Sequence, residues 1–194
     1  NIKNINKNLD KVCKKIGCNK NNLILLNQIH SNIVHKVDKI PKKKLKGDSL
    51  ITNKKGIALA ILTADCAPVF IYDPINGLIS ALHAGWKGAY KNIISTTLRK
   101  FRLSGSNFED LIAVVGPCIS KNNYEVKVDF FKKFTGKNKL NKKFFNTKNN
   151  KMYFSLNDYI KENLLKLGVK NIEIVKKDTY TSSNNFLSAR RSLK

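Results

Sequence analysis

One turn signature constrains the fold of this chain more than any other feature of its sequence. The pairs Asp73-Pro74 and Asn76-Gly77 stand between two apolar runs, residues 69–72 and 78–82. Such dipeptides favour tight turns, and the flanking runs are typical of strands. The sequence therefore predicts an antiparallel hairpin here, and we expect the fold to contain a sheet.

Other segments divide between strand and helix patterns. Short apolar runs predict further strands at residues 23–26, 33–37, 56–61, 111–115 and 171–175. Apolar spacing and capping signals predict helices at residues 5–16, 88–101, 128–134 and 156–167. The Lys- and Asn-rich residues 136–151 are expected to form an exposed loop. Because strands outnumber helices in a mixed order, we expect a single layered α/β (α+β) domain over residues 1–194, with a mixed sheet and flanking helices.

The bulk composition narrows the class of protein. A hydrophobic fraction of 42% can fill a core, and no run approaches the ~20 apolar residues that cross a bilayer. The first residues lack the apolar region of a signal peptide. The four cysteines follow no zinc-ribbon or disulfide-scaffold pattern. We therefore expect a cytoplasmic protein with free thiols and no membrane partner.

The net charge of +24, from 37 Lys and Arg against 13 Asp and Glu, raises the question of nucleic-acid binding. The basic residues are mostly Lys and are scattered over the whole chain. No segment alternates aromatic residues with Lys or Arg as a stacking platform does. Nucleic-acid binding is therefore disfavoured as the main function and stays as an alternative. The surplus charge is still expected to attract anionic metabolites such as phosphate.

Two of the three histidines and one cysteine form a candidate metal site. His30 follows an apolar strand, His83 follows the strand of residues 78–82, and Cys66 lies in a loop between two strands. Neighbouring strands can bring such side chains to one rim of a sheet. Two imidazoles and a thiolate suit zinc, and three protein ligands leave a fourth position for water or substrate. On spacing alone, the alternative of two structural histidines and a core thiol stays open.

The residues after His83 indicate an anion site. Free backbone N–H groups at the start of a helix, with a lysine beside them, bind anions well. A phosphate held there would lie close to a metal on His83. The alternative is an ordinary turn from strand to helix, with the tryptophan in the core. The candidate phosphate-binding residues are Gly85, Trp86, Lys87 and Gly88.

Six motifs, in order along the chain, extend this interpretation. They are Gln28-Ile-His30-Ser31, Gly47-Asp48-Ser-Leu-Ile-Thr52, Leu62-Thr-Ala-Asp-Cys-Ala-Pro-Val69, His83-Ala-Gly-Trp-Lys-Gly88, Gly116-Pro-Cys-Ile119 with Tyr124-Glu-Val126, and Phe186-Leu-Ser-Ala-Arg-Arg191. Together they resemble the laccase-domain or polyphenol oxidase family. Members of that family are regarded as purine nucleoside phosphorylases that also deaminate adenosine. The resemblance covers residues 23–191.

The resemblance implies a fold related to that of the cytotoxic necrotizing factor toxins. The zinc ligands that it implies are His30, Cys66 and His83. It also implies that the family's N-terminal strand is missing from this sequence, with Asn6-Lys7 as the nearest match to the Asn-Arg that begins the family's first helix. Two positions depart from the family pattern: Asp178 replaces a frequent cysteine, and Ala189 replaces an aromatic residue.

The function that the resemblance implies is zinc-dependent phosphorolysis of adenosine, inosine or methylthioadenosine, with adenosine deamination as a side activity. Phosphate would attack C1′ and the purine would leave, while zinc polarises the substrate. Lys87 with Arg190 or Arg191 is expected to hold the phosphate. Asp65 or Glu125 is expected to move protons. The alternatives are that Asp65 orients a ligand, that Glu125 is a surface charge, and that the two arginines form a solvated basic end.

Two other enzyme classes remain open. Three histidines are too few for a multicopper oxidase, although one copper on two imidazoles and a thiolate would resemble a blue-copper site. The sole methionine, Met152, lies in a predicted polar loop, so copper is expected only as an occasional occupant, with copper-dependent phenol oxidation as an alternative. A cysteine hydrolase would use Cys66 as nucleophile and His83 as base. Stoichiometric zinc on Cys66 would contradict that class.

Overall fold

The hairpin predicted from the turn signature lies at the centre of the main sheet. In the computed structural model, which describes residues 2–192, β5 (Ala67–Asp73) and β6 (Leu78–Ala84) pair antiparallel. The carboxylate of Asp73 accepts hydrogen bonds from backbone N–H groups of the turn, and Gly77 has a φ of 64°. Because glycine adopts a left-handed φ without steric cost, these turn residues favour the observed pairing.

A six-stranded mixed sheet extends outward from this hairpin. Its order is β11-β7-β5-β6-β3-β2, with antiparallel pairs in the middle and a parallel pair at each edge. The outer strands are β11 (Asn171–Ile174), β7 (Ile112–Val115), β3 (Ser49–Thr52) and β2 (Val34–Lys36). The strands predicted at 33–37, 111–115 and 171–175 are confirmed, whereas β3 has no counterpart among the predicted strands.

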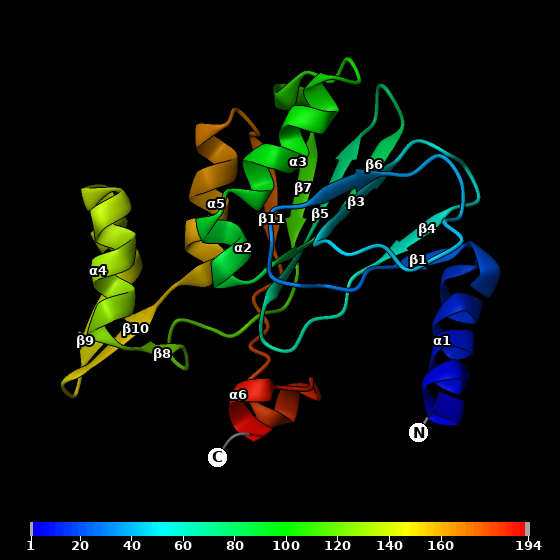
Figure 1. Ribbon diagram of the computed structural model, residues 1–194. Coiled ribbons are helices and arrows are strands. Elements are labelled where there is room, and N and C mark those ends of the chain that lie inside the picture. Colours follow the sequence, from blue (N-terminus) through cyan, green and yellow to red (C-terminus); the bar gives the residue numbers. More distant parts are fainter. Residues whose placement is uncertain (1, 193–194) are drawn as a thin grey trace.

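Helices cover one face of this sheet. α3 (Ile93–Arg102) packs on β2, β3 and β6, and α5 (Leu156–Lys166) packs on β7 and β11. Figure 1 shows both helices in front of the sheet, where they also contact each other. Their apolar side chains and the facing side of the sheet form the main core. The expected mixed α/β domain with flanking helices is thus confirmed.

The helix predicted over residues 88–101 is interrupted. α2 (Trp86–Tyr90) ends before α3 begins, and Asn92 between them has a φ of 66°. A continuous helix was therefore the wrong prediction, because an asparagine that tolerates left-handed backbone turns the chain here. The apolar face itself is buried as predicted, with Ile93, Ile94, Thr97, Leu98 and Phe101 in the core.

The exposed loop predicted at residues 136–151 is also wrong. The Lys and Asn side chains that suggested it are mostly exposed, but Phe144 is buried, and so is Phe154 just beyond. The strand pair in this segment joins a third strand, β8 (Glu125–Val126), in a small antiparallel sheet. The elements from residue 128 onward are α4 (Val128–Lys137), a 3-10 helix (Lys139–Phe144), β9 (Phe145–Lys148) and β10 (Lys151–Phe154).

A second, smaller core lies on the other side of β3. β1 (Leu23–Leu25) and β4 (Ala58–Ala60) form a parallel pair. Ile24 packs there with Leu50, whereas the next residue of β3, Ile51, belongs to the main core. Because successive side chains of a strand point to opposite faces, β3 joins the two cores.

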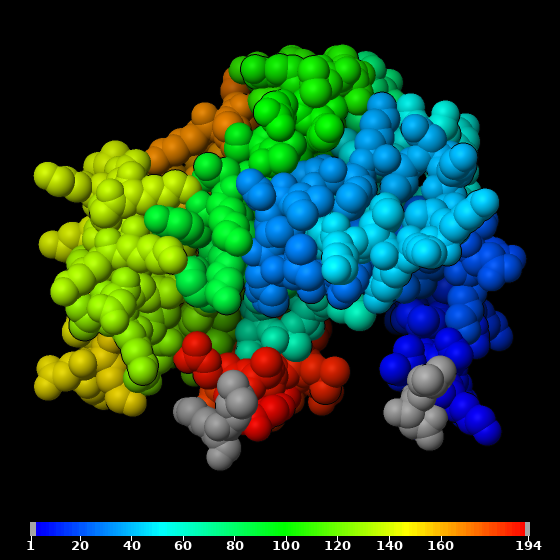
Figure 2. Space-filling model, viewed as in Figure 1, coloured from blue at the N-terminus to red at the C-terminus, as the bar shows by residue number. Residues whose placement is uncertain are grey.

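Each end of the described chain carries a helix, a long one at the N-terminal end and a short one at the C-terminal end. α1 (Ile2–Ile16) matches the helix predicted over residues 5–16 and is followed by Gly17, which has a φ of 68°. The C-terminal segment ends in α6 (Ala189–Ser192), and Figure 2 shows it in red between the yellow-green and blue regions of the surface.

No helix among residues 2–192 is long and apolar enough to cross a membrane. Three further 3-10 helices span Lys20–Asn22, Phe108–Asp110 and Ser182–Asn184.

Candidate metal centre

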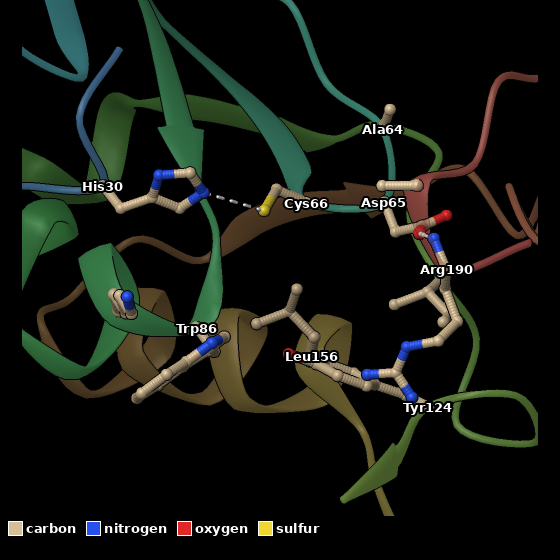
Figure 3. Close-up of a pocket in the computed structure, with 11 residues that line it drawn as sticks. His30, Ala64, Asp65, Cys66, Trp86, Tyr124, Leu156 and Arg190 are labelled. Atoms are coloured by element: carbon tan, nitrogen blue, oxygen red, sulfur yellow. Dashed lines mark hydrogen bonds between the residues drawn. The ribbon is translucent and has the colours of Figure 1, made fainter. Parts of the chain in front are cut away.

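The three proposed metal ligands, His30, Cys66 and His83, lie together. One nitrogen of each imidazole and the sulfur of Cys66 lie within 4.8 Å of one another, and His30 Nε2 is 3.9 Å from Cys66 Sγ. The two imidazole rings meet edge to face, with centroids 4.7 Å apart. Figure 3 shows His30 and Cys66 facing each other at one end of a pocket.

The hairpin and the loops beside it bring these ligands together. His83 lies in β6 opposite Pro68 of β5. Cys66 comes just before β5 and therefore lies near the C-terminal end of β6, close to His83. Gln28, two residues before His30, holds its loop against the loop that leads to Cys66. Its side-chain amide donates to the carbonyl of Leu62 and accepts from the N–H of the same residue. Two loops far apart in sequence are therefore tied together close to the site.

Gly85 provides the space that the Cys66 sulfur occupies. A Cβ atom at this position would lie 2.5 Å from Cys66 Sγ and 3.2 Å from Cδ2 of His30. The first distance is far below van der Waals contact, so any larger residue would displace a ligand. Gly85 therefore leaves room for the side chains of the proposed ligands, and its role in phosphate binding stays a prediction.

Asp48 organises both histidines, although the sequence analysis did not single it out. Its Oδ1 accepts hydrogen bonds from Nδ1 of His83 at 2.8 Å and from the N–H of His30 at 3.0 Å, and Oδ2 accepts from the N–H and hydroxyl of Ser31. The bond from Nδ1 leaves Nε2 of His83 to face a metal. The bond from His30 supports a backbone with a φ of 56°, which non-glycine residues rarely adopt. The signal in the sequence was the motif that contains Asp48.

The electrostatics of the site suit ligands more than a free nucleophile. Burial opposes ionisation of Asp48, but hydrogen bonds from His83 and Ser31 outweigh it and lower its pKa, so it stays charged. Burial and the neighbouring His83 lower the pKa of His30, which keeps its imidazole neutral. Burial, and then the nearby carboxylates, raise the pKa of Cys66 to about 11. A bound cation reverses that effect, because a coordinating thiol is deprotonated.

The donor set fits a divalent ion that prefers nitrogen and sulfur. Tetrahedral zinc bonds of about 2.0–2.3 Å set neighbouring donors about 3.3–3.6 Å apart. The distances of 3.9 Å and up to 4.8 Å therefore need only small side-chain movements. The space beside Gly85 and the fixed orientation of His83 are the features that favour such a site.

His30 and Cys66 line a cavity of about 270 Å³, the metal cavity, whereas His83 is buried beside them and does not line it. In Figure 3, His30, Cys66 and Asp65 lie along one wall, Trp86, Leu156 and Tyr124 lie opposite, and Arg190 lies at the end away from His30. A metal here would therefore face a pocket bounded by aromatic and basic side chains.

A family model described as multi-copper polyphenol oxidoreductase laccase matches residues 1–194. The chain belongs to this family. It is 38% identical to a purine nucleoside phosphorylase of Rickettsia conorii. The 172 aligned residues are 88% of this chain and 71% of the relative. A purine nucleoside phosphorylase of Borreliella burgdorferi is 35% identical over 163 residues, or 82% of this chain and 70% of the relative.

Solved structures support the same fold for this member of the family. The hypothetical protein YfiH of Bacillus licheniformis superposes with a TM-score of 0.89 at 30% identity, covering 96% of this chain and 75% of that one. A Neisseria meningitidis protein superposes with a TM-score of 0.88 at 26% identity. The superposition covers 98% of this chain and 77% of that one.

Asp65 and Arg190, proposed for catalysis in this family member, lie side by side at the cavity. Oδ1 of Asp65 accepts from the hydroxyl of Thr179, and Oδ2 accepts from the backbone N–H of Arg190, each at 2.8 Å. The guanidinium of Arg190 donates to the carbonyl of Glu125 at 2.9 Å and lies 5.5 Å from the ring of Tyr124. Asp65 therefore anchors the C-terminal segment beside the metal ligands.

Glu125 and Arg191 are placed away from the metal cavity. The carboxylate of Glu125 pairs with Lys151 at 3.1 Å on an exposed surface, and only its carbonyl contacts Arg190. The guanidinium of Arg191 donates to three backbone carbonyls of the C-terminal segment. Neither residue lines the metal cavity. This placement favours the surface-charge alternative for Glu125 and a structural role for Arg191.

The predicted anion site after His83 divides into two pairs of residues. Trp86 and Lys87 line the cavity, whereas Gly85 and Gly88 allow close packing, since a Cβ on Gly88 would lie 3.1 Å from the carbonyl oxygen of Ser31. α2 has only five residues, so its start contributes little as a helix terminus. Any anion near this turn would depend mainly on Lys87.

Tyr124 is a cavity residue that the sequence analysis did not single out. Its ring is buried, and burial raises the pKa of its hydroxyl, which stays protonated. Ala189 also lines the cavity, so the aromatic residue expected there in the family would occupy part of this space. Asp178 is the other position at which the sequence departs from the family pattern. Its carboxylate accepts hydrogen bonds from Ser120 and Asn123 and so joins two loops.

Proposed function

We propose that this protein is a zinc-dependent purine nucleoside phosphorylase. The observation that carries the proposal is the convergence of His30, Cys66 and His83 beside a cavity that His30 and Cys66 line together with Lys87 and Arg190. The relatives from Rickettsia conorii and Borreliella burgdorferi bear that enzyme name. Purine nucleosides and phosphate are the proposed substrates, and the cytoplasm is the proposed setting.

In the proposed reaction, a phosphate oxygen bonds to C1′ of the ribose as the bond from C1′ to the purine nitrogen breaks. The electron pair leaves with the purine, which takes up a proton, and ribose 1-phosphate forms. Zinc is the proposed ion because two neutral imidazoles and a thiolate suit it. When bound, it supplies a Lewis acid that polarises a substrate atom.

The protein's own side chains would bind and position the phosphate. Lys87 and Arg190 are the proposed phosphate-binding cations, since both line the cavity and charge-assisted hydrogen bonds hold phosphate strongly. Asp65 fixes the backbone of Arg190, so we propose it as a positioning residue, with proton transfer as the alternative. Glu125 is assigned no step, because its carboxylate lies outside the metal cavity.

Adenosine deamination is a proposed side activity of the same cavity. In that reaction water replaces the amino group of the purine and ammonia leaves. Known zinc deaminases also combine imidazole and thiolate ligands, which supports this addition to the proposal.

The other enzyme classes find less support. His35 donates from Nε2 to the carbonyl of Lys46, and within residues 2–192 no second group of three ligating side chains lies close enough to hold an ion. A multicopper centre needs more ligands than that, and Met152 lies in β10 without lining the cavity. The raised pKa of Cys66 is the reverse of what a cysteine nucleophile needs.

The test joins metal analysis to product analysis. Purified protein is incubated with adenosine and phosphate, and adenine, ribose 1-phosphate, inosine and hypoxanthine are quantified. We expect about one zinc per chain and phosphate-dependent adenine release, both lost in Cys66→Ala. Cys18→Ala, which removes a free thiol outside the site, is the matched control. Equal traces of product from the wild type and Cys66→Ala would refute the enzymatic proposal.

A further inference from the structure

A second cavity, of about 650 Å³, adjoins the metal cavity. The two share three lining residues, Trp86, Tyr124 and Arg190, so they meet at these side chains. The second cavity lies along β8 and the first turns of α4. The reaction described above gives this second cavity no role.

The walls of the second cavity are largely apolar and its rim is charged. The rings of Trp86 and Phe130 lie 5.1 Å apart at 60°, and Tyr124 lies 6.2 Å from Phe130. Val126 adds an aliphatic surface. Apolar walls with a few polar groups at the edge suit a flat heterocycle, which stacks on aromatic rings and hydrogen-bonds at its periphery. The charged residues of the lining are Glu125, Lys127, Asp129, Lys133 and Arg190.

The metal cavity is the smaller of the two cavities. Its volume of about 270 Å³ lies below the range of about 300–1,000 Å³ usual for small-molecule sites. In the proposed displacement at C1′, the purine leaves on the side opposite the attacking phosphate. Base and phosphate therefore need separate pockets that meet at the ribose, which is the arrangement of the two joined cavities.

We propose that the second cavity binds the purine base, with the ribose at the junction of Trp86, Tyr124 and Arg190. This inference rests on the proposed phosphorylase function. It places the phosphate at the metal end, near Lys87, and the base away from the metal. Deamination at the metal would then require the reverse orientation of the nucleoside.

The test uses Trp86, the only tryptophan of the chain, as a fluorescent probe. Adenine alone is titrated into zinc-loaded protein and into chelator-treated protein. We expect adenine to quench the fluorescence in both, with dissociation constants that differ by less than about threefold, because the base does not contact the metal. Absence of binding, or binding that is lost with the zinc, would overturn the proposal.

The second part of the test is a variant in which a larger side chain fills the second cavity. Val126→Phe occupies the second cavity without adding a tryptophan, and we expect it to weaken adenine binding by at least about tenfold with zinc content unchanged. Val175→Phe is the control, because Val175 is exposed and lines neither cavity. Wild-type adenine affinity in Val126→Phe would refute the base site.

Photolabelling keeps the proposal testable if Val126→Phe fails to fold. Azidoadenine activated on the wild-type protein should label residues 124–133, and labelling confined to the metal-ligand segments would contradict the proposal. The phosphorylase function and the base site can be refuted by different results. Adenine binding as expected without ribose 1-phosphate formation would refute only the phosphorylase function, whereas turnover that Val126→Phe leaves unchanged would refute only the base site.

Discussion

The carboxylate of Asp48 accepts a 2.8 Å hydrogen bond from Nδ1 of His83, and both side chains are buried. One acidic residue thereby selects the nitrogen that His83 presents to a metal and also holds the backbone of His30. We expect Asp48→Asn to weaken zinc binding by about 10- to 100-fold, because an amide cannot accept all of these donors. Competition with a chromogenic zinc chelator measures the change.

Asp10→Asn is the matched control for this experiment. Asp10 is an exposed aspartate paired with Lys20 on the surface. The zinc affinity of Asp10→Asn should therefore equal that of the wild type. Thermal unfolding of both metal-free variants separates a loss of affinity from a loss of folding. Wild-type zinc affinity in folded Asp48→Asn would show that Asp48 does not orient the ligands.

The contact between Gly85 and Cys66 gives a second prediction. A methyl group on Gly85 would meet Cys66 Sγ at 2.5 Å, so we expect Gly85→Ala to reduce zinc occupancy strongly by displacing the sulfur. Elemental analysis of the purified protein measures the occupancy. Gly136→Ala serves as control, because a Cβ there meets nothing within 4 Å, and alanine within α4 should add about 0.5–1 kcal/mol of stability. Full zinc occupancy in Gly85→Ala would show that the site does not depend on the space beside Gly85.

Asp65→Asn distinguishes a positioning role from proton transfer. Asp65 holds Thr179 and the backbone of Arg190. We therefore expect the variant to raise KM for phosphate and to speed amide hydrogen exchange in residues 179–192, with the pH profile of kcat unchanged. If Asp65 moved protons instead, kcat would fall by about 10²- to 10⁴-fold while exchange in that segment stayed slow.

Local patterns in the sequence account for the parts of the structure that were predicted well. The hairpin follows from Asp73 and Gly77, whose preferences act within a few residues. The positions of His30, Cys66 and His83 at strand ends and loops brought them under consideration, and the resemblance to the family then supported the same three residues as ligands. Their convergence still depends on long-range pairing, which spacing alone does not determine.

The prediction errors arise where distant contacts outweigh local pattern. The break at Asn92 leaves the apolar face of α3 intact, so hydrophobic periodicity carries no sign of it. In residues 136–151, abundant Lys and Asn masked buried aromatic residues such as Phe144. Asp48 was missed because its partners are mostly backbone N–H groups and a histidine 35 positions away. Glu125 was selected for its carboxylate, but its carbonyl is the group that reaches Arg190.

Asp178 yields a prediction about pH, because its carboxylate joins two loops. It accepts two hydrogen bonds from Ser120, one from Asn123 and one from the N–H of Tyr180. Burial opposes its ionisation, but these hydrogen bonds outweigh that effect and lower its pKa. The folded protein therefore keeps this charge to a lower pH than the unfolded chain does. The resulting stability is complete above about pH 5 and is lost as the pH falls through the folded pKa.

Asp178→Asn should accordingly lower the free energy of unfolding by about 1–3 kcal/mol at neutral pH. The difference from the wild type should shrink as the pH falls through the lowered folded pKa, because the wild-type carboxyl then becomes protonated as well. Urea unfolding at several pH values measures both quantities, with Asp110→Asn as a control at an exposed aspartate. A difference that stayed constant with pH would assign the effect to the shape of the side chain, since only the charged form responds to acid.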